Sequence, residues 1–350
     1  MTPERKYFVD RDAKKMNDRL DKSAPRDGFA RTIDYLRLSV TDRCNLRCRY
    51  CMPEEGVDRI SHDKVMRFEE IVTLIRAAAN VGFQKIRLTG GEPLVRRDIT
   101  KLVRMIRDIE GITDLSMTTN GVLLEEKAQE LYTAGIQRVN ISLDTLVKEK
   151  FLQVTRRDEF NAVMRGIDAA LSVGMHPVKI NVVLIRDFND DEIFDFIELT
   201  RGRPLSVRFI EYMPTNGAQA WNTDMIVPMD ELLSTLSTRY EIDKLDKRSG
   251  AGPSVDFKIP GFSGTLGFIT PVSSHFCDRC NRIRVTSDGR IRSCLFSDDE
   301  AHILALLRGG KDLTVIGDFI LDVLKNKPKR HSITSGRIRT CQRSMSEIGG

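Results

Sequence analysis

Cysteines are the residues of this sequence whose type and spacing most clearly could do chemistry. The chain has seven. Six of them form two groups, which are Cys44, Cys48 and Cys51 (C-x3-C-x2-C) and Cys277, Cys280 and Cys294 (C-x2-C-x13-C). Clustered thiolates bind soft metals and iron–sulfur clusters. A cubane cluster has four irons, so three cysteines leave one iron open to a substrate or cofactor. The first group therefore predicts a catalytic cluster, and the second again offers three ligands.

A structural zinc site is the alternative for both groups. Zinc in such sites takes four ligands. The first group would need a distant fourth ligand, and His275 could complete the second. Cys341 is left as an uncommitted thiol, and an odd number of cysteines argues against a disulfide framework.

Two further motifs could bring polar groups to a site. Thr89-Gly-Gly-Glu-Pro93 follows a predicted strand. Its adjacent glycines permit close approach of another backbone, and Glu92 would offer a carboxylate to an amino group. Arg282 and Arg284 are two residues apart, so they point to the same side of an extended segment and could clamp phosphates. Two solvated arginines are the alternative.

Polar residues also recur on or directly after four successive predicted strands. They are Thr118, Asn120, Ser142, Asp144, Lys179, Asn181, Glu211 and Tyr212-Met213. Each one alone could be a helix cap. Four strands in succession favour a shared site, because the ends of neighbouring parallel strands meet at one mouth of a barrel.

Strand and helix patterns alternate along the first two thirds of the chain. Period-two runs predict strands over 35–40, 85–89, 114–118, 138–142, 177–183 and 205–210. Helical spacing predicts helices over 68–81, 99–108, 123–134, 160–173 and 191–200. This alternation predicts an α/β fold with a parallel sheet and right-handed crossovers.

Charged residues alternate with apolar ones in several of these strands, as at Arg37, Arg87 and Lys179. Strands covered by helices on both faces would be continuously apolar. We therefore expect a partial (β/α)6 TIM-like barrel that curls around a polar interior, rather than a doubly wound sheet. Lys85 has the same parity as Arg87 and is a second phosphate candidate.

The chain divides into four expected segments. These are an N-terminal extension over 1–30 whose order the sequence leaves open, a barrel over 31–210, a smaller α+β domain over 211–343 with the second cysteine group, and a tail over 344–350. The net charge is +5, and residues 325–350 alone carry +6. That basic end predicts either a solvated segment or a polyanion site.

Composition excludes several classes of protein. Aromatic residues make up only 7% of the chain, which argues against a surface that stacks many bases. No stretch approaches the roughly 18 uncharged apolar residues of a membrane span. The first residues lack the apolar core of a secretory signal, so we expect a cytoplasmic protein.

The run CNLRCRYC followed by TGGEP resembles the radical S-adenosylmethionine (SAM) superfamily. Within it, the stretch LRLSVTDRCNLRCRYCMP, the second cysteine group, the RIR after it and the terminal Gly-Gly are similar to the branch that cyclises GTP at the start of molybdenum cofactor biosynthesis. The similarity runs from about Arg31 to Gly350. It implies a radical SAM barrel with a second cluster in the C-terminal domain.

The resemblance implies a role for each motif residue. Each cysteine group would hold a [4Fe–4S] cluster, the first binding SAM and the second facing guanine. The SAM-binding residues of this chain would be Tyr50, Gly91, Ser142 and Met213. Its GTP-binding residues would be Arg37, Arg87, Thr118, Lys179, Arg282, Ile283 and Arg284. We further predict that Gly349 and Gly350 enter the site and take part in the chemistry, because a basic segment is drawn to a triphosphate and glycine lacks a Cβ that would clash.

The activity implied is radical conversion of GTP to 3′,8-cyclo-7,8-dihydro-GTP. The implied partners are GTP, an electron donor and a cyclic pyranopterin monophosphate synthase that receives the product. Nucleic acid and membranes are not expected, and the sequence leaves a homodimer open. Two alternatives stay open, namely a two-cluster radical SAM enzyme that modifies a peptide and a zinc-stabilised nucleic-acid-binding protein.

Overall fold

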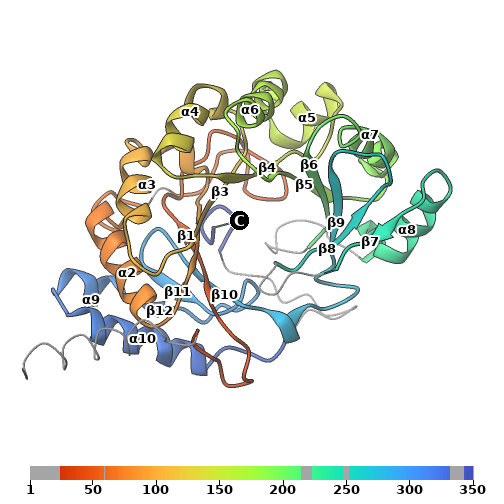
Figure 1. Cartoon of the computed structure of the whole chain (residues 1–350). Helices are drawn as coiled ribbons and strands as arrows, with labels where there is room; N and C mark the ends of the chain where they lie inside the picture. The colour runs from red at the N-terminus through yellow and green to blue at the C-terminus, as the bar shows by residue number, and fades with distance from the viewer. Residues whose placement is uncertain (1–23, 59, 214–222, 247–251, 332–342, 350) are drawn as a thin grey trace, which may run out of the picture.

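A curved sheet flanked by helices organises the computed structural model of this chain (Figure 1). The structure describes residues 24–58, 60–213, 223–246, 252–331 and 343–349. Cys341, Gly350 and most of the expected N-terminal extension lie outside these described residues.

Six parallel strands form the centre of the sheet, in the order of the chain. They are β1 (Tyr35–Ser39), β2 (Lys85–Thr89), β3 (Asp114–Thr119), β4 (Arg138–Ser142), β5 (Val178–Leu184) and β6 (Leu205–Glu211). The helices between them are α2 (Phe68–Asn80), α3 (Ile99–Arg107), α4 (Leu124–Ala134), α5 (Lys148–Thr155), α6 (Phe160–Ser172) and α7 (Ile193–Glu198). Every strand and helix predicted for this region is confirmed within three residues at each end, and α5 is additional.

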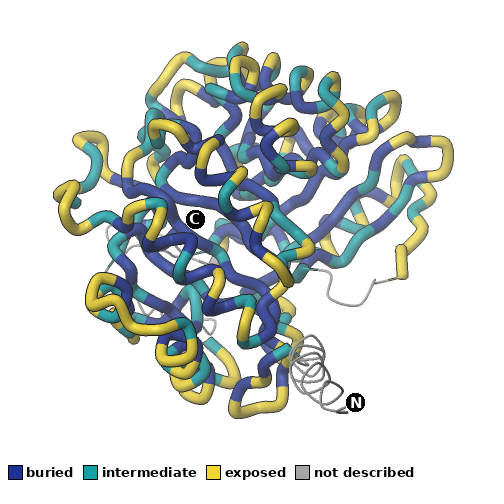
Figure 2. The backbone as a smooth tube through the Cα atoms, turned by 60° about the vertical axis from the view of Figure 1, so that its left-hand side comes forward, coloured by how far each residue is buried: buried dark blue, intermediate teal, exposed yellow. Residues whose placement is uncertain are grey.

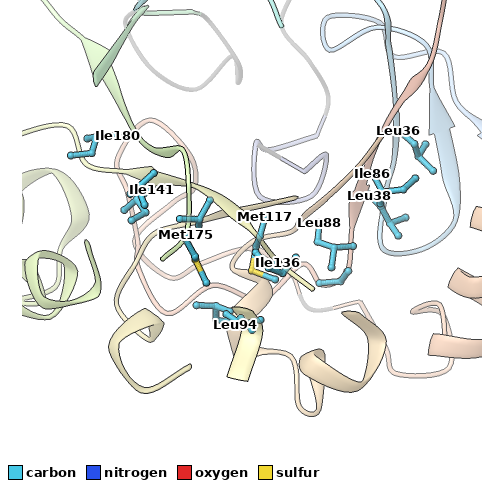
Figure 3. Close-up of a cluster of buried hydrophobic side chains, with 14 of the residues drawn as sticks. Leu36, Leu38, Ile86, Leu88, Leu94, Met117, Ile136, Ile141, Met175 and Ile180 are labelled. Atoms are coloured by element: carbon cyan, nitrogen blue, oxygen red, sulfur yellow. The ribbon is translucent and has the colours of Figure 1, made fainter. Parts of the chain in front are cut away.

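The alternation within each strand separates an apolar outer face from a polar inner face. Figure 3 shows Leu36, Leu38, Ile86, Leu88 and Met117 in one buried cluster, and all five are at most 1% exposed. The residues between them, including Arg37 and Arg87, point the other way because strand side chains alternate with a period of two. Helices surround the outer face, so the expected partial barrel with a polar interior is confirmed (Figure 1).

Helices α2 to α7 cover the outer face because each has an apolar stripe. In α2, Ile71, Leu74, Ile75 and Ala78 recur at helical spacing and are buried. Figure 2 shows the strands as buried and the outward turns of the helices as exposed. Among the described helices, none combines the length and apolar character needed to cross a bilayer.

The C-terminal half of the chain extends both edges of the same sheet. At one edge β9 (Thr265–Ile269) pairs in parallel with β6 and is followed by β8 (Val255–Lys258) and β7 (Asp243–Lys244). At the other edge β10 (Arg282–Val285) pairs in parallel with β1, followed by β11 (Arg290–Arg292) and β12 (Ala301–His302). A domain boundary at 210/211 stays a prediction, since the strands on both sides of it share one sheet.

The remaining elements are short or peripheral. They are helices α8 (Met229–Ser237), α9 (Leu304–Arg308) and α10 (Leu313–Lys325), and the 3-10 turns η1 (Pro93–Val95), η2 (Asp190–Glu192), η3 (Thr223–Met225) and η4 (Cys277–Arg279). Helix α10 begins at an Asp312 cap, whose carboxylate accepts the backbone N–H groups of Thr314 and Val315. It packs against α2, and Gly317 leaves room there for Val81.

Pairing of β9 with β6 gives a test of the shared sheet. A Cβ added at Gly264 would lie 2.1 Å from the carbonyl oxygen of Leu205, so Gly264→Ala must push the two strands apart. We expect the free energy of unfolding to fall by about 1–3 kcal/mol, measured by urea denaturation followed by circular dichroism. Gly202→Ala is the control, because an added Cβ meets nothing within 4 Å there. Equal stability of the two variants would contradict this pairing.

Candidate active site with two cysteine groups

One cavity of about 1040 Å³ lies on the inner face of the sheet, and both cysteine groups line it. All six of these cysteines are free thiols. The other predicted site residues that line it are Arg37, Tyr50, Arg87, Gly91, Thr118, Ser142, Lys179, Met213, Arg282 and Arg284. Ile283 does not line it. Its side chain is 1% exposed and lies on the opposite face of β10, so only its backbone could serve the predicted GTP contact.

The first cysteine loop follows β1 and is held from behind by α5, the helix that the sequence patterns missed. The N–H groups of Arg47 and Arg49 donate to the carbonyls of Thr155 and Val154, both at 2.9 Å. Cys51 N–H donates to the carbonyl of Cys48 at 2.9 Å, which forms a tight turn. The spacing of the thiols is thus set by backbone hydrogen bonds.

The two glycines of the TGGEP motif let the chain after β2 touch this loop. Gly91 N–H donates to the carbonyl of Thr41 at 2.7 Å, and Glu92 N–H donates to that of Arg43, also at 2.7 Å. A Cβ on Gly91 would lie 2.3 Å from the Arg43 carbonyl oxygen. The expected close backbone approach is therefore confirmed, and its partner is the cysteine loop. A SAM contact for Gly91 stays a prediction.

Glu92 is held by several hydrogen bonds within the protein. Its carboxylate accepts hydrogen bonds from Leu94 N–H at 3.0 Å, Thr119 Oγ1 at 2.7 Å and Asn120 N–H at 2.6 Å. The side chain is 1% exposed, and this burial raises its pKa to about 7. Glu92 therefore ties the end of β3 to the end of β2. It also lines the cavity, and the expectation that it offers its carboxylate to an amino group stays a prediction.

Tyr50 and Asp144 form a buried polar pair beside the first cysteine group. The Tyr50 hydroxyl donates to Asp144 Oδ2, and Val183 N–H donates to Oδ1 at 2.8 Å. Burial raises the pKa of Asp144 to about 6, against the effect of these hydrogen bonds. The pair fixes the Tyr50 side chain against the exit of β5.

The two cysteine groups have different electrostatic surroundings. Burial raises the pKa of Cys44 to about 11, helped by nearby Glu92, and burial raises that of Cys51 to about 12. At Cys280 burial is outweighed by the cations Lys327 and Arg282, which lower its pKa to about 7. A cysteine binds a metal as a thiolate. At the first group a bound metal would supply the positive charge that stabilises the thiolates, whereas at the second group cations of the protein supply it.

Two buried cations hold the second cysteine loop in place. Arg31 donates to the carbonyls of Cys277 and Lys329, both at 2.8 Å, and forms an ion pair with Asp27. Lys327 donates to the carbonyl of Arg282 at 2.9 Å and to that of Ser293. The residues around Asp27, to which the sequence assigned no role, therefore support this loop.

The zinc alternative finds no donor set in the described part of the chain. No three His, Cys, Asp or Glu side chains there come close enough to hold a single metal ion. His275, the suggested fourth ligand, is exposed, and its Nδ1 lies 3.0 Å from the carbonyl of Pro271. Thiols that line a large cavity without converging on one point suit a polynuclear cluster, which holds its ligands further apart.

The cavity wall is strongly basic, although residues 1–324 are nearly neutral in sum. Among the described residues, eleven Lys and Arg and five Asp and Glu line it. Lys85 is neutralised by Asp34 at 2.7 Å and Arg138 by Asp114, whereas no described ion pair holds Arg87. The second-rank phosphate candidate, Lys85, is thus already paired.

Lys179 reports the density of positive charge. Burial lowers its pKa to about 7, and the guanidinium groups of Arg208, Arg138 and Arg87 add to the shift. Arg208 and Arg138 were missed by the sequence reasoning. Their parity with Ser206 on β6 and with Asn140 on β4 could have revealed them, because each lies on the polar side of its strand.

Several buried polar atoms beside these cations have no hydrogen-bond partner among the described residues. They are Tyr35 Oη, Thr118 Oγ1, Asn181 Oδ1 and Arg208 Nε. Leaving a buried polar atom unpaired costs about 1–3 kcal/mol. Together with the cations, these atoms suit a large polar anion.

The end of the described chain reaches this site. The Gly349 carbonyl accepts hydrogen bonds from Arg284 Nη1 at 2.7 Å and Arg37 Nη2 at 3.3 Å. Gly349 has φ +75°, and an added Cβ would lie 2.6 Å from Thr89 Oγ1. Met345 and Ser346 line the cavity, whereas Gly349 does not. The tail therefore binds two of the arginines that were predicted to bind GTP. Gly350, which was predicted to enter the site with Gly349, lies outside the described residues.

Comparison with known proteins agrees with this geometry. The Radical SAM superfamily model matches residues 38–200, and the Molybdenum Cofactor Synthesis C model matches residues 205–333. The solved structure of Streptococcus suis SuiB bound to precursor peptide SuiA is similar with a TM-score of 0.56 and 16% identity, covering 94% of this chain and 73% of that one. That likeness shows the fold alone.

Full-length relatives are much closer in sequence. The GTP 3′,8-cyclase of Syntrophomonas wolfei is 46% identical over 93% of this chain and 99% of its own length. The GTP 3′,8-cyclase of Moorella thermoacetica is 47% identical over 93% of this chain and 100% of its own length. Identity at this level along the barrel and the C-terminal strands means that this chain belongs to the GTP 3′,8-cyclase family of the radical SAM superfamily.

Proposed function

We propose that this chain converts GTP to 3′,8-cyclo-7,8-dihydro-GTP, the first step of molybdenum cofactor biosynthesis. The observation that carries the proposal is that two groups of three free thiols and a basic wall line one cavity. The proposed reaction would use both cysteine groups and the basic wall. The base and ribose of GTP would lie between the two clusters, and its phosphates would meet the cations.

Cys44, Cys48 and Cys51 would hold the SAM-binding cluster. When bound, that cluster and SAM would supply reductive cleavage of the sulfonium C–S bond, the chemistry needed for hydrogen abstraction at ribose C3′ and ring closure to guanine C8. The chain contributes placement and exclusion of water. Tyr50, which is fixed by Asp144, would line the SAM site together with Gly91, Ser142 and Met213.

Cys277, Cys280 and Cys294 would hold a second [4Fe–4S] cluster that faces guanine. The cations beside Cys280 favour its thiolate and so favour ligation. The triphosphate would lie against Arg87, Lys179, Arg208 and Arg282, with Thr118 beside them. These residues hold the substrate in the ground state and the transition state alike, so their loss should raise KM first.

We also infer the partners and the location that such a reaction requires. The chain would take electrons from a separate donor, hand its product to a cyclic pyranopterin monophosphate synthase, and work in the cytoplasm. The peptide-modifying alternative is supported only by likeness of fold, which does not carry a substrate.

The two cysteine groups should divide the work. Cys48→Ala should abolish formation of 5′-deoxyadenosine, since it removes a ligand of the SAM-binding cluster. Cys280→Ala should spare part of this cleavage and abolish the cyclised product. Both products are measured by chromatography after anaerobic reconstitution, with iron content as the control. Equal loss of cleavage in both variants would show that the groups do not have separate roles.

Lys179 should make GTP binding depend on pH. Its pKa in the free protein is about 7, so the ammonium that would bind phosphate is lost as the pH rises above 7. The affinity for GTP should then fall by up to about tenfold per pH unit above 7, measured by calorimetry. Lys179→Arg keeps its charge throughout and should remove this part of the dependence. An unchanged pH profile in the variant would exclude Lys179 from the phosphate site.

The tail should be required for product formation. Ending the chain at Ile348 removes Gly349 and with it the contact to Arg284 and Arg37. Iron content and SAM binding should stay normal while product formation falls by orders of magnitude. Residues added beyond Gly350 should have a similar effect, because the end must fit a crowded site. Turnover within a few-fold of the full chain would mean that the tail has no part in the chemistry.

A further inference from the structure

We propose that Arg343 is a positioning residue that fixes the tail in register with the active site, through its ion pairs with Asp288 and Glu300. The consequence for turnover rests on the proposed function, in which the tail takes part in the reaction. The docking of the tail itself does not depend on that function.

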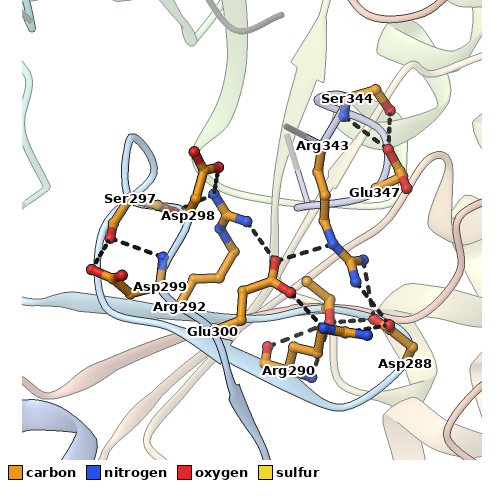
Figure 4. A network of polar contacts seen from close by, with 11 residues as sticks. Asp288, Arg290, Arg292, Ser297, Asp298, Asp299, Glu300, Arg343, Ser344 and Glu347 are labelled. Atoms are coloured by element: carbon orange, nitrogen blue, oxygen red, sulfur yellow. Dashed lines mark hydrogen bonds and ion pairs between the residues drawn. The ribbon is translucent and has the colours of Figure 1, made fainter. Parts of the chain in front are cut away.

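Arg343 lies directly before the tail (344–350), and its guanidinium binds two carboxylates (Figure 4). Its Nη1 and Nη2 donate to the two oxygens of Asp288 at 3.3 and 3.0 Å, and its Nε lies 3.0 Å from Glu300 Oε1. A guanidinium held by two carboxylates has a defined position as well as a favourable charge interaction.

The two carboxylates are themselves fixed by the β10–β11 hairpin. Asp288 also accepts from Arg290 at 2.9 Å and from the Thr286 hydroxyl at 2.5 Å. Glu300 also binds Arg290 and Arg292. Burial alone would raise the pKa of Asp288, but its bonds to Arg343 and Thr286 hold it at about 2. These side chains are largely shielded from solvent, so the ion pairs are stronger than exposed ones.

A compact turn connects Arg343 to the tip of the tail. The carboxylate of Glu347 accepts from the N–H and the hydroxyl of Ser344 at 2.8 and 2.9 Å. Ile348, the next residue, is 1% exposed. This turn restricts the conformations of the chain between Arg343 and Gly349, so a displacement of Arg343 also displaces Gly349.

The root and the tip of the tail are held by one structural unit. Arg284 on strand β10 donates a hydrogen bond to the Gly349 carbonyl. Asp288, in the turn after β10, accepts hydrogen bonds from Arg343. The hairpin therefore fixes the distance between Arg343 and Gly349. Arg343 would set where Gly349 lies without touching substrate or cluster ligands.

The test uses the full-length, iron-reconstituted enzyme and compares Arg343→Gln with wild type. The first readout is the rate at which a carboxypeptidase removes the terminal glycines, followed anaerobically by intact-mass spectrometry. A lost charge-assisted contact corresponds to roughly tenfold or more, so release should quicken by at least about tenfold. Arg343→Lys should restore part of the protection. Arg165→Gln removes an exposed ion pair between α6 and Glu125 on α4; it is the matched control and should change nothing.

The second readout is turnover at saturating and limiting GTP. In Arg343→Gln the loss should fall on kcat, with iron content and SAM binding unchanged. Combining it with Asp288→Asn should quicken glycine release by less than the two single effects together, because both changes break the contact between Arg343 and Asp288 and only the bonds of Asp288 to Arg290 and Thr286 are lost in addition. Faster release with normal turnover would leave the docking role standing and refute a catalytic tail. Unchanged release, or an additive effect of the two substitutions, would overturn the proposal.

Discussion

Positive charge gathered inside a curved sheet is the constraint on which the rest of this structure depends. Like charges so close together repel one another, and burial together with this repulsion lowers the pKa of Lys179. Acidic partners neutralise two of the cations that line the cavity, in the pairs Lys85–Asp34 and Arg138–Asp114. A triphosphate would supply the missing negative charge, so substrate binding and relief of repulsion would be one event.

The pairing of late strands with the six-stranded core brings the two cysteine groups to one cavity. Strands β9 and β10 pair in parallel with opposite edges of the six-stranded core, so segments late in the chain flank its first and last strands. Because β10 lies beside β1, the loop of Cys277 and Cys280 comes to the same cavity as the loop of Cys44.

Several motifs act as supports for one another rather than as separate contacts. The glycines after β2 allow that chain to lie against the first cysteine loop, and Glu92 fastens β2 to β3. Arg31 secures the second loop to residues near both ends of the described chain. Buried hydrogen-bonded charges of this kind are costly to disturb, since removing one partner leaves the other unpaired. The thiols are thereby preorganised before any metal binds.

Local patterns in the sequence were enough to predict the strands, the helices, the polar inner face and both cysteine groups. Each depends on residues a few positions apart, through periods of two and 3.6 or through ligand spacing. The tertiary structure decided the role of Glu92, the edges taken by β9 and β10, and the support of the second loop by Arg31. It also decided that the tail reaches Arg284, 65 residues earlier, just as Arg31 reaches Cys277 across 246 residues. Contacts over such separations depend on how complete elements pack together, and no local period encodes that packing.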